Sequence, residues 1–140
     1  MGTFKFLEHT ADEKIAIVAT SYEDLFQTAI KAIYETMLGK KEVKSIQTKE
    51  FSLENKKITT LLYDFINEFI ILFDEESLLL PNIQSLTIKN ENNMYKLNVK
   101  VSGDKVKNYE IENQIKNMTY SDMIIEEKNN QIHAQIVVDI

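Results

Sequence analysis

The chain has 140 residues, a net charge of −6 and no cysteine. This length suits one domain over residues 1–140, and the absence of cysteine excludes disulfides, thiolate metal sites and cysteine nucleophiles. All the basic residues are lysines, and the lysines that cluster loosely at 40–49 and 105–107 are offset by acidic neighbours, so we expect no direct, tight binding of RNA or DNA. No secretory signal or membrane-spanning apolar run of ~20 residues is visible, which favours a cytoplasmic protein.

The first forty residues predict two strands and a helix. Phe4 to Glu8 forms a short predicted strand, and apolar residues at every position of Ile15 to Ala19 indicate a second strand, buried on both faces. Ser21, with Asp24 three residues later, is close to a capping box. Apolar residues at helical spacing follow, and Gly39 is the predicted end of this helix.

The middle of the chain predicts a strand and then a long helix. Ser45 to Leu53 alternates weakly in polarity, as strands do. Asn55 is placed to cap a helix with an amphipathic apolar stripe: Ile58, Leu61, Leu62, Phe65, Ile66, Phe69, Ile70 and Phe73. The helix is expected to end in the acidic run 74–76, which we interpret as a solvated exit rather than a metal site, and Pro81 excludes its continuation.

The remainder predicts β structure. A polar loop of about ten residues is expected from Gly103-Asp104, and Asn129-Asn130 suits a hairpin turn because Asn tolerates positive φ. The predicted strands are 83–89, 95–101, 115–125 (with or without a bulge) and 132–138. The sequence therefore predicts an α+β, single-domain two-layer sandwich with about seven mostly antiparallel strands and two helices.

Acidic groups stand at the ends of two predicted strands. Asp12 follows the first apolar run, and Asp139 precedes the last residue, Ile140, so that its carboxylate lies beside a free α-carboxylate. Burying these anions uncompensated is costly, so either water or a cation must take them up. If the two ends of the chain meet, the oxygen-rich groups suit a hard cation such as Ca²⁺ or Mg²⁺. The alternative is two solvated carboxylates at frayed ends.

Two further polar residues have open roles. His9 either orients Asp12 by a hydrogen bond or is a half-buried corner residue. Lys116, in an apolar strand context, either snorkels or reaches a carboxylate or phosphate of a partner. The chain has no Gly-x-Ser-x-Gly elbow and no glycine-rich phosphate loop, so an enzyme is not expected.

Several segments, in order over the whole length, resemble the archease family. They are Phe6-Leu7-Glu8-His9-Thr10-Ala11-Asp12, the helix start at 21–29, the helix segments 61–68 and 72–74, the Lys-x-x-Thr-Tyr strand at 115–123, and the terminus Val137-Val138-Asp139-Ile140. No single motif decides the assignment, but together they are in register and coincide with the family pattern at both ends.

This resemblance implies a protein co-factor of the GTP-dependent RNA-splicing ligase, which joins 2′,3′-cyclic phosphate or 3′-phosphate RNA ends to 5′-hydroxyl ends. The archease is expected to promote transfer of GMP onto the ligase and multiple turnover in tRNA splicing. The resemblance also implies a divalent metal, with calcium favoured over magnesium or manganese, on Asp12, Asp139 and the terminal oxygens of Ile140, with Lys116 nearby. The alternatives are a broader chaperone or modulator of nucleic-acid-processing proteins and, third, a metal-dependent hydrolase or nucleotidyl enzyme.

The chain departs from the family pattern near the predicted metal site. Glu13 and Lys14 follow Asp12, where an apolar and then a small residue are usual. Asn117 replaces a small apolar residue after Lys116, and Ser121 stands where many members have histidine. The first pair could alter the electrostatics beside the metal, and no role for that histidine carries over.

Overall fold

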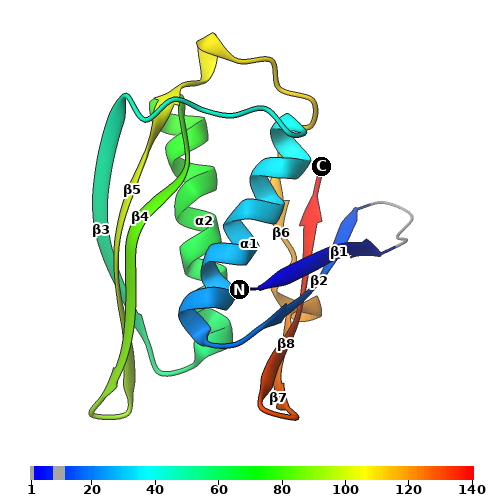
Figure 1. Cartoon of the computed structure of the whole chain (residues 1–140), viewed down its shortest axis with the longest axis vertical. Helices are drawn as coiled ribbons and strands as arrows, with labels where there is room; N and C mark the ends of the chain where they lie inside the picture. Colours follow the sequence, from blue (N-terminus) through cyan, green and yellow to red (C-terminus); the bar gives the residue numbers. More distant parts are fainter. Residues whose placement is uncertain (1, 8–11) are drawn as a thin grey trace.

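The computed structural model describes residues 2–7 and 12–140. In these residues it contains two α-helices and strands in two sheets, and every strand pairing is antiparallel (Figure 1), which confirms the predicted α+β fold. The elements are β1 (Thr3–Leu7), β2 (Glu13–Ala19), α1 (Tyr22–Leu38), β3 (Gln47–Asn55), α2 (Ile58–Glu76), β4 (Leu78–Glu91), β5 (Met94–Lys105), β6 (Asn117–Met118), β7 (Ile124–Lys128) and β8 (Gln131–Asp139). Two 3₁₀ turns, η1 (Val106–Asn108) and η2 (Tyr120–Asp122), flank β6 along the chain.

The two helices pack against both sheets. One sheet has the order β1-β2-β8-β6, with β7 also paired to β8, and the other has the order β3-β5-β4. In Figure 1 the helices lie between the sheets; α1 contacts β2 and β4, and α2 contacts β3, β4 and β6. Phe26 of α1 and Phe65 of α2 meet at the centre of the shared core, with ring centroids 5.2 Å apart. Neither described helix is long and apolar enough to cross a bilayer.

Helix α1 begins and ends as its sequence predicts. The hydroxyl of Ser21 accepts a hydrogen bond from the backbone N–H of Asp24 at 3.0 Å, which satisfies one of the free donors of the first turn. At the other end Gly39 has a φ of 69°, a conformation that glycine adopts without strain. The capping prediction at each end is therefore confirmed.

Helix α2 begins later than predicted, and Asn55 is not its cap. Asn55 is the last residue of β3, and its side-chain oxygen accepts from the backbone N–H of Lys57 at 3.1 Å. This short side-chain turn aims the chain into the helix, whose N-cap residue Lys57 makes no side-chain cap hydrogen bond. The helix includes the acidic run and ends at Glu76, after which Ser77 adopts a left-handed conformation.

Strands β4 and β5 are longer than predicted, and Gly103-Asp104 lies inside β5 rather than at the start of a loop. Pro81 lies within β4 at a register shift between Leu79 and Asn82, a position where a strand tolerates a missing N–H. A Cβ at Gly103 would clash with the carbonyl oxygen of Leu79, so only glycine fits this close approach.

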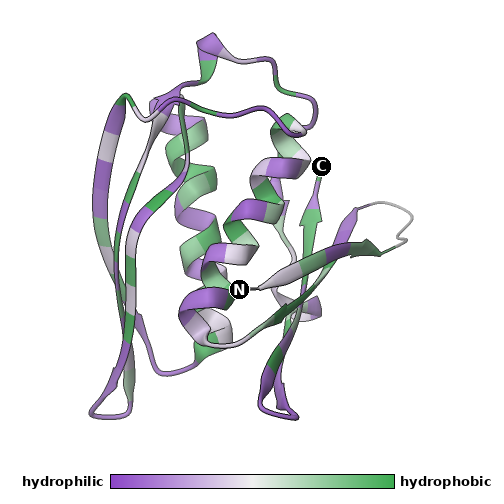
Figure 2. Ribbon diagram, viewed as in Figure 1, coloured by the Kyte–Doolittle hydropathy of each residue, from purple (hydrophilic) through white to green (hydrophobic). Residues whose placement is uncertain are grey.

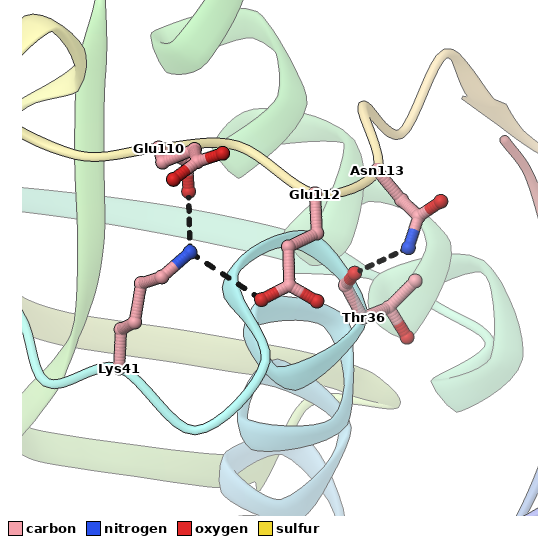
Figure 3. Close-up of polar contacts among 5 residues, drawn as sticks. All are labelled: Thr36, Lys41, Glu110, Glu112 and Asn113. Carbon is pink, nitrogen blue, oxygen red and sulfur yellow. Dashed lines mark hydrogen bonds and ion pairs between the residues drawn. The ribbon is translucent and has the colours of Figure 1, made fainter.

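The segment between β5 and β6 is fastened to the C-terminal end of α1 (Figure 3). The backbone N–H of Glu112 donates to the carbonyl of Met37 at 2.7 Å, and the side-chain amide of Asn113 donates to the carbonyl of Thr36 at 3.1 Å. Lys41 holds the carboxylate of Glu112 at 3.3 Å. These contacts satisfy carbonyls that have no partner within the helix, and they direct the chain into β6.

The end of the chain forms a hairpin. The predicted strand over 115–125 is wrong in part, because β6 has only two residues and η2 separates it from β7. Asn129 and Asn130, with φ values of 54° and 61°, form the predicted turn between β7 and β8. Strand β8 then runs between β2 and β6 to Asp139, and the C-terminus lies at the upper right of Figure 1, below the loop that joins β5 to β6.

Candidate metal centre

The structure brings Asp12 and Asp139 to the same end of the five-stranded sheet. Strands β2 and β8 are antiparallel, and the last pair in their register is Glu13 with Val138. Asp12, in a bend just outside β2, and Asp139 are the residues next to this pair. If the register continued by one residue, their Cβ atoms would be roughly 5 Å apart, a separation at which one cation could reach both carboxylates.

Both carboxylates belong to the face of this sheet that points away from the helices. Ile15 and Ile17 of β2, and Ile136 and Val138 of β8, are buried toward the helices. Side chains alternate between the faces of a strand, so the alternation assigns Asp139 to the opposite, outer face, and we expect the same face for Asp12, one residue before β2. Both residues are half-buried, which leaves part of each accessible to a partner.

Strand β6 adds polar groups on the other side of Asp139. Asn117 pairs directly with Asp139, and the backbone N–H of Lys116 donates to the carbonyl oxygen of Asp139 at 2.8 Å. The side chain of Lys116 is exposed rather than covered by apolar neighbours. The pairing assigns Asn117, whose side-chain oxygen is a hard ligand, to the same face as Asp139.

The residues after Asp12 fall on different faces. Glu13 pairs with Val138 and belongs to the helix-facing side, whereas Lys14 pairs with Val137 and belongs to the outer side. Residues two apart along a strand are separated by ~7 Å. Lys14 is therefore a cation on the same face as Asp139, and its charge offsets part of any repulsion between the two aspartates.

The donor set has the chemistry of a hard-cation site. Asp12, Asp139, the amide oxygen of Asn117 and the terminal oxygens of Ile140 are all oxygen donors, which Ca²⁺ and Mg²⁺ prefer. Within residues 2–7 and 12–140, no group of three or more His, Cys, Asp or Glu side chains could hold a metal. The set therefore needs backbone, amide or terminal oxygens in addition to its two aspartates. His9 lies outside the described residues.

The structure gives the surroundings of two residues, Asn117 and Ser121, for which the sequence predicted no role. Asn117 was noticeable only as a departure from the family pattern, and no sequence signal indicates that it pairs with Asp139. Ser121, which stands in place of a common histidine, is exposed on η2, and η2 packs against β8. The hydroxyl of its neighbour Tyr120 forms a hydrogen bond with Thr60 of α2 at 2.8 Å.

Comparison with known proteins agrees with the fold and with the resemblance found in the sequence. Residues 4–140 match the model of the archease protein family (MTH1598/TM1083). The protein archease of Pyrococcus abyssi is 30% identical over 143 residues, which cover 100% of both chains. That of Methanosarcina barkeri is 27% identical over 139 residues, which cover 98% of this chain and 95% of its own.

Two solved structures share the fold. Protein 1598 of Methanobacterium thermoautotrophicum superposes with a TM-score of 0.81 at 22% identity, covering 98% of each chain. An archease of Thermotoga maritima, described as a possible chaperone, has a TM-score of 0.64 at 23% identity and covers 97% of this chain and 96% of its own. Since the family model matches the chain from Phe4 to its last residue, the protein belongs to the archease family.

Proposed function

We propose that this archease is a metal-binding protein co-factor that activates the GTP-dependent RNA-splicing ligase. It would promote guanylylation of the ligase and its multiple turnover in tRNA splicing and RNA repair. The observation that supports the proposal is the register of β2 and β8, whose last pair, Glu13 with Val138, is adjacent in sequence to Asp12 and Asp139. Membership of the archease family supports the choice of partner.

Asp12 and Asp139 would hold a divalent ion together with the terminal oxygens of Ile140, with calcium favoured and magnesium or manganese also suited to oxygen donors. When bound, such an ion supplies positive charge that can stabilise the phosphates of a nucleotide. With both carboxylates on the outer face of the sheet, the open side of the metal site would face the ligase. Asn117 would fix Asp139 from the neighbouring strand.

The other charges of the chain fit a protein partner better than nucleic acid. The net charge of −6 favours docking onto a basic protein and disfavours independent RNA binding. Lys116 is exposed, directly precedes β6 and bonds the carbonyl of Asp139 through its backbone N–H; its side chain would add a point charge toward a phosphate group of the ligase-bound nucleotide.

The proposal is tested by mixing the cognate ligase with GTP and Mn²⁺ and measuring the rate at which GMP is transferred to the ligase. Wild-type archease should accelerate this step, and Asp12→Ala should not. Glu54→Gln is the matched control, because Glu54 is an exposed acid on the other sheet and its loss should leave activation intact. Equal acceleration by wild type and Asp12→Ala would exclude a role for the metal site.

A broader chaperone function is the second candidate, because the Thermotoga maritima relative is described as a possible chaperone. This function predicts that the protein suppresses aggregation of unrelated clients, and that Asp12→Ala does so as well as wild type. Light scattering of a heat-denatured client, with both proteins, separates it from ligase activation.

A further inference from the structure

Strand β1, drawn in dark blue in Figure 1, is an edge strand of its sheet. It pairs with β2 on one side, and no described strand pairs with its other side, which we call the open edge. In an antiparallel sheet the N–H and C=O of one residue point to one neighbouring strand, and those of the next residue point to the other. The backbone N–H of Thr119, next to β6, donates to the carbonyl of Val137 at 3.0 Å. Val137 therefore faces β6, and its neighbour Ile136 faces β2.

The same alternation identifies the backbone groups on the open edge. Ile15 of β2 pairs with Ile136 on one side and with Phe6 on the other. Because the backbone groups of Ile15 are used toward β8, those of Phe6 point away from β2. Phe4, which pairs with Ile17, has the same orientation. The N–H and C=O groups of Phe4 and Phe6 therefore lie on the open edge, and no described residue hydrogen-bonds them.

The edge of β4 beside α1 is protected in a way that β1 is not. The hydroxyl of Tyr34 accepts the N–H of Leu80 at 3.0 Å, and the carboxylate of Glu23 accepts the N–H of Ile88 at 3.4 Å. Covering backbone donors in this way is how proteins prevent unwanted strand pairing. On β1 the side chain of Phe6 is 41% exposed, and Figure 2 shows the hydrophobic colour reaching the arrow end of the strand.

A groove of about 900 Å³ begins beside the open edge. Phe4 lines it from β1, Leu38 from α1, and Ile83 from β4. The ring of Phe4 also packs against that of Phe6, with centroids 5.4 Å apart. A strand added to β1 would run along the rim of this groove and turn every second side chain toward the two rings.

The charges beside the open edge favour an acidic occupant. The charged residues of β1 and of the groove that form no ion pair in the described chain are Lys5, Lys31, Lys40, Glu35 and Glu42. Three lysines less two glutamates give +1, whereas the whole chain carries −6. Lys5 is exposed on the edge strand itself, where it would stand directly beside an outward side chain of an added strand.

We propose that the open edge of β1 binds an extended, acidic segment of a protein partner by strand addition, a role that does not depend on the proposed function. Hydrogen bonds to Phe4 and Phe6 recognise the backbone of the segment, and alternate side chains give the sequence preference. Apolar side chains pack against the two rings, and acidic ones stand beside Lys5. In a second copy of the chain, antiparallel pairing of two β1 strands about Lys5 would oppose two lysines, which is unfavourable.

The test uses two blocked six-residue peptides, one of alternating valine and glutamate and one of alternating valine and lysine. Amide hydrogen exchange and ¹⁵N chemical shifts of the full chain are measured with each. In the free protein the amides of Phe4 and Phe6 should exchange faster than those of Lys5 and Leu7. The valine-glutamate peptide should slow that exchange, and the valine-lysine peptide should bind roughly tenfold more weakly.

Two pairs of variants separate the backbone contact from the charge. Phe6→Pro and Phe6→Ala both remove the ring, but only proline removes the N–H on the open edge, which the pairing with β2 does not use. Kd of the valine-glutamate peptide should be roughly tenfold higher for Phe6→Pro than for Phe6→Ala. Lys5→Glu should reverse the preference between the peptides, and Lys89→Glu, at an exposed position of β4, should match wild type.

Urea denaturation verifies that each variant folds, and Lys5→Glu decides the test if Phe6→Pro does not. The inference is overturned if several millimolar of the valine-glutamate peptide leaves the Phe4 and Phe6 amides unchanged, or if the two peptides bind equally. Slow exchange of these amides in a peptide-free dimer would assign the open edge to a second copy instead. Each of these results leaves ligase activation through the metal site standing, because no ligase enters the test.

Discussion

Removing one charge from the aspartate pair should have opposite effects on stability with and without metal. Asp139→Asn keeps the shape of the side chain and removes its charge. At the roughly 5 Å expected for opposed residues, two unit charges repel by about 0.8 kcal/mol in a water-like dielectric and about 3 kcal/mol at an effective dielectric constant of 20. Because both aspartates are half-buried and Lys14 is near, we expect a value toward the lower limit, about 1 kcal/mol.

Metal reverses the sign of this difference. A ligand that binds only the folded state at about one hundred times its Kd stabilises that state by about 2.7 kcal/mol. In a chelator, Asp139→Asn should therefore be more stable than wild type by about 1 kcal/mol. In saturating Ca²⁺ it should be less stable by roughly 1.5 to 2 kcal/mol, provided that the variant no longer binds.

Urea denaturation at fixed, low ionic strength measures both differences, and Glu54→Gln serves as the control because its effect should be the same in chelator and in Ca²⁺. High salt should shrink the advantage of Asp139→Asn in chelator, since exposed charges are screened. The reasoning is refuted if Ca²⁺ leaves the wild-type midpoint unchanged, or if Asp139→Asn destabilises the protein equally in both conditions.

Three further substitutions test the packing and hydrogen bonds of the scaffold. Gly103→Ala should destabilise the protein by about 3 kcal/mol in urea, because its Cβ meets the carbonyl oxygen of Leu79; a loss below ~1 kcal/mol would contradict that packing. The pKa of Asp104 is lowered chiefly by a hydrogen bond from the backbone N–H of Lys105. Because the folded pKa is lower than the unfolded value near 4, the ionised carboxyl stabilises the fold at higher pH. This contribution is lost as the pH falls through the folded pKa. Asp104→Asn should therefore flatten the acid decline of the urea midpoint, and an unchanged decline would show that other groups cause it. Asn113→Ala removes a hydrogen bond to the last turn of α1 and should lower the free energy of unfolding by about 1 kcal/mol; no loss would mean that water replaces the amide.

Local signals predicted the parts of the fold that depend on neighbours in sequence. Ser21 and Gly39 delimit α1 because a capping hydroxyl and a left-handed glycine act within one turn of the helix. The Asn129-Asn130 turn is equally local. The apolar stripe of α2 predicted the helix, although not its first residue, because Asn55 turns the chain before the helix instead of capping it.

Non-local contacts decided the parts that the sequence did not predict. Pro81 was interpreted only as a residue that the helix cannot pass, and the next strand was predicted from residue 83; β4 instead begins at Leu78 and continues through Pro81, because the register shifts there and Tyr34 of α1 accepts the adjacent Leu80 N–H at 3.0 Å. Gly103 resembled the start of a loop, but it allows β5 to approach the backbone of Leu79. Neither contact has a signature in the flanking residues.

The sequence predicted the candidate site as two separate strand ends, and the strand order of the five-stranded sheet explains why these ends are neighbours. Asp12 and Asp139 stood out because each follows an apolar run, but only the pairing of β2 with β8 brings the two strand ends next to them together. Asn117 could not be predicted, because a two-residue strand carries no periodic pattern. Its place depends on Glu112 and Asn113, which fasten the preceding segment to α1.

Calorimetric titration of Ca²⁺ into wild type, Asp12→Asn and Asp139→Asn tests the account's central claim most directly, because it asks whether the ends of β2 and β8 form one metal centre. The account predicts one site per chain in wild type, lost or strongly weakened in each variant alone. Wild-type affinity and stoichiometry in either variant would show that the two aspartates do not share a metal.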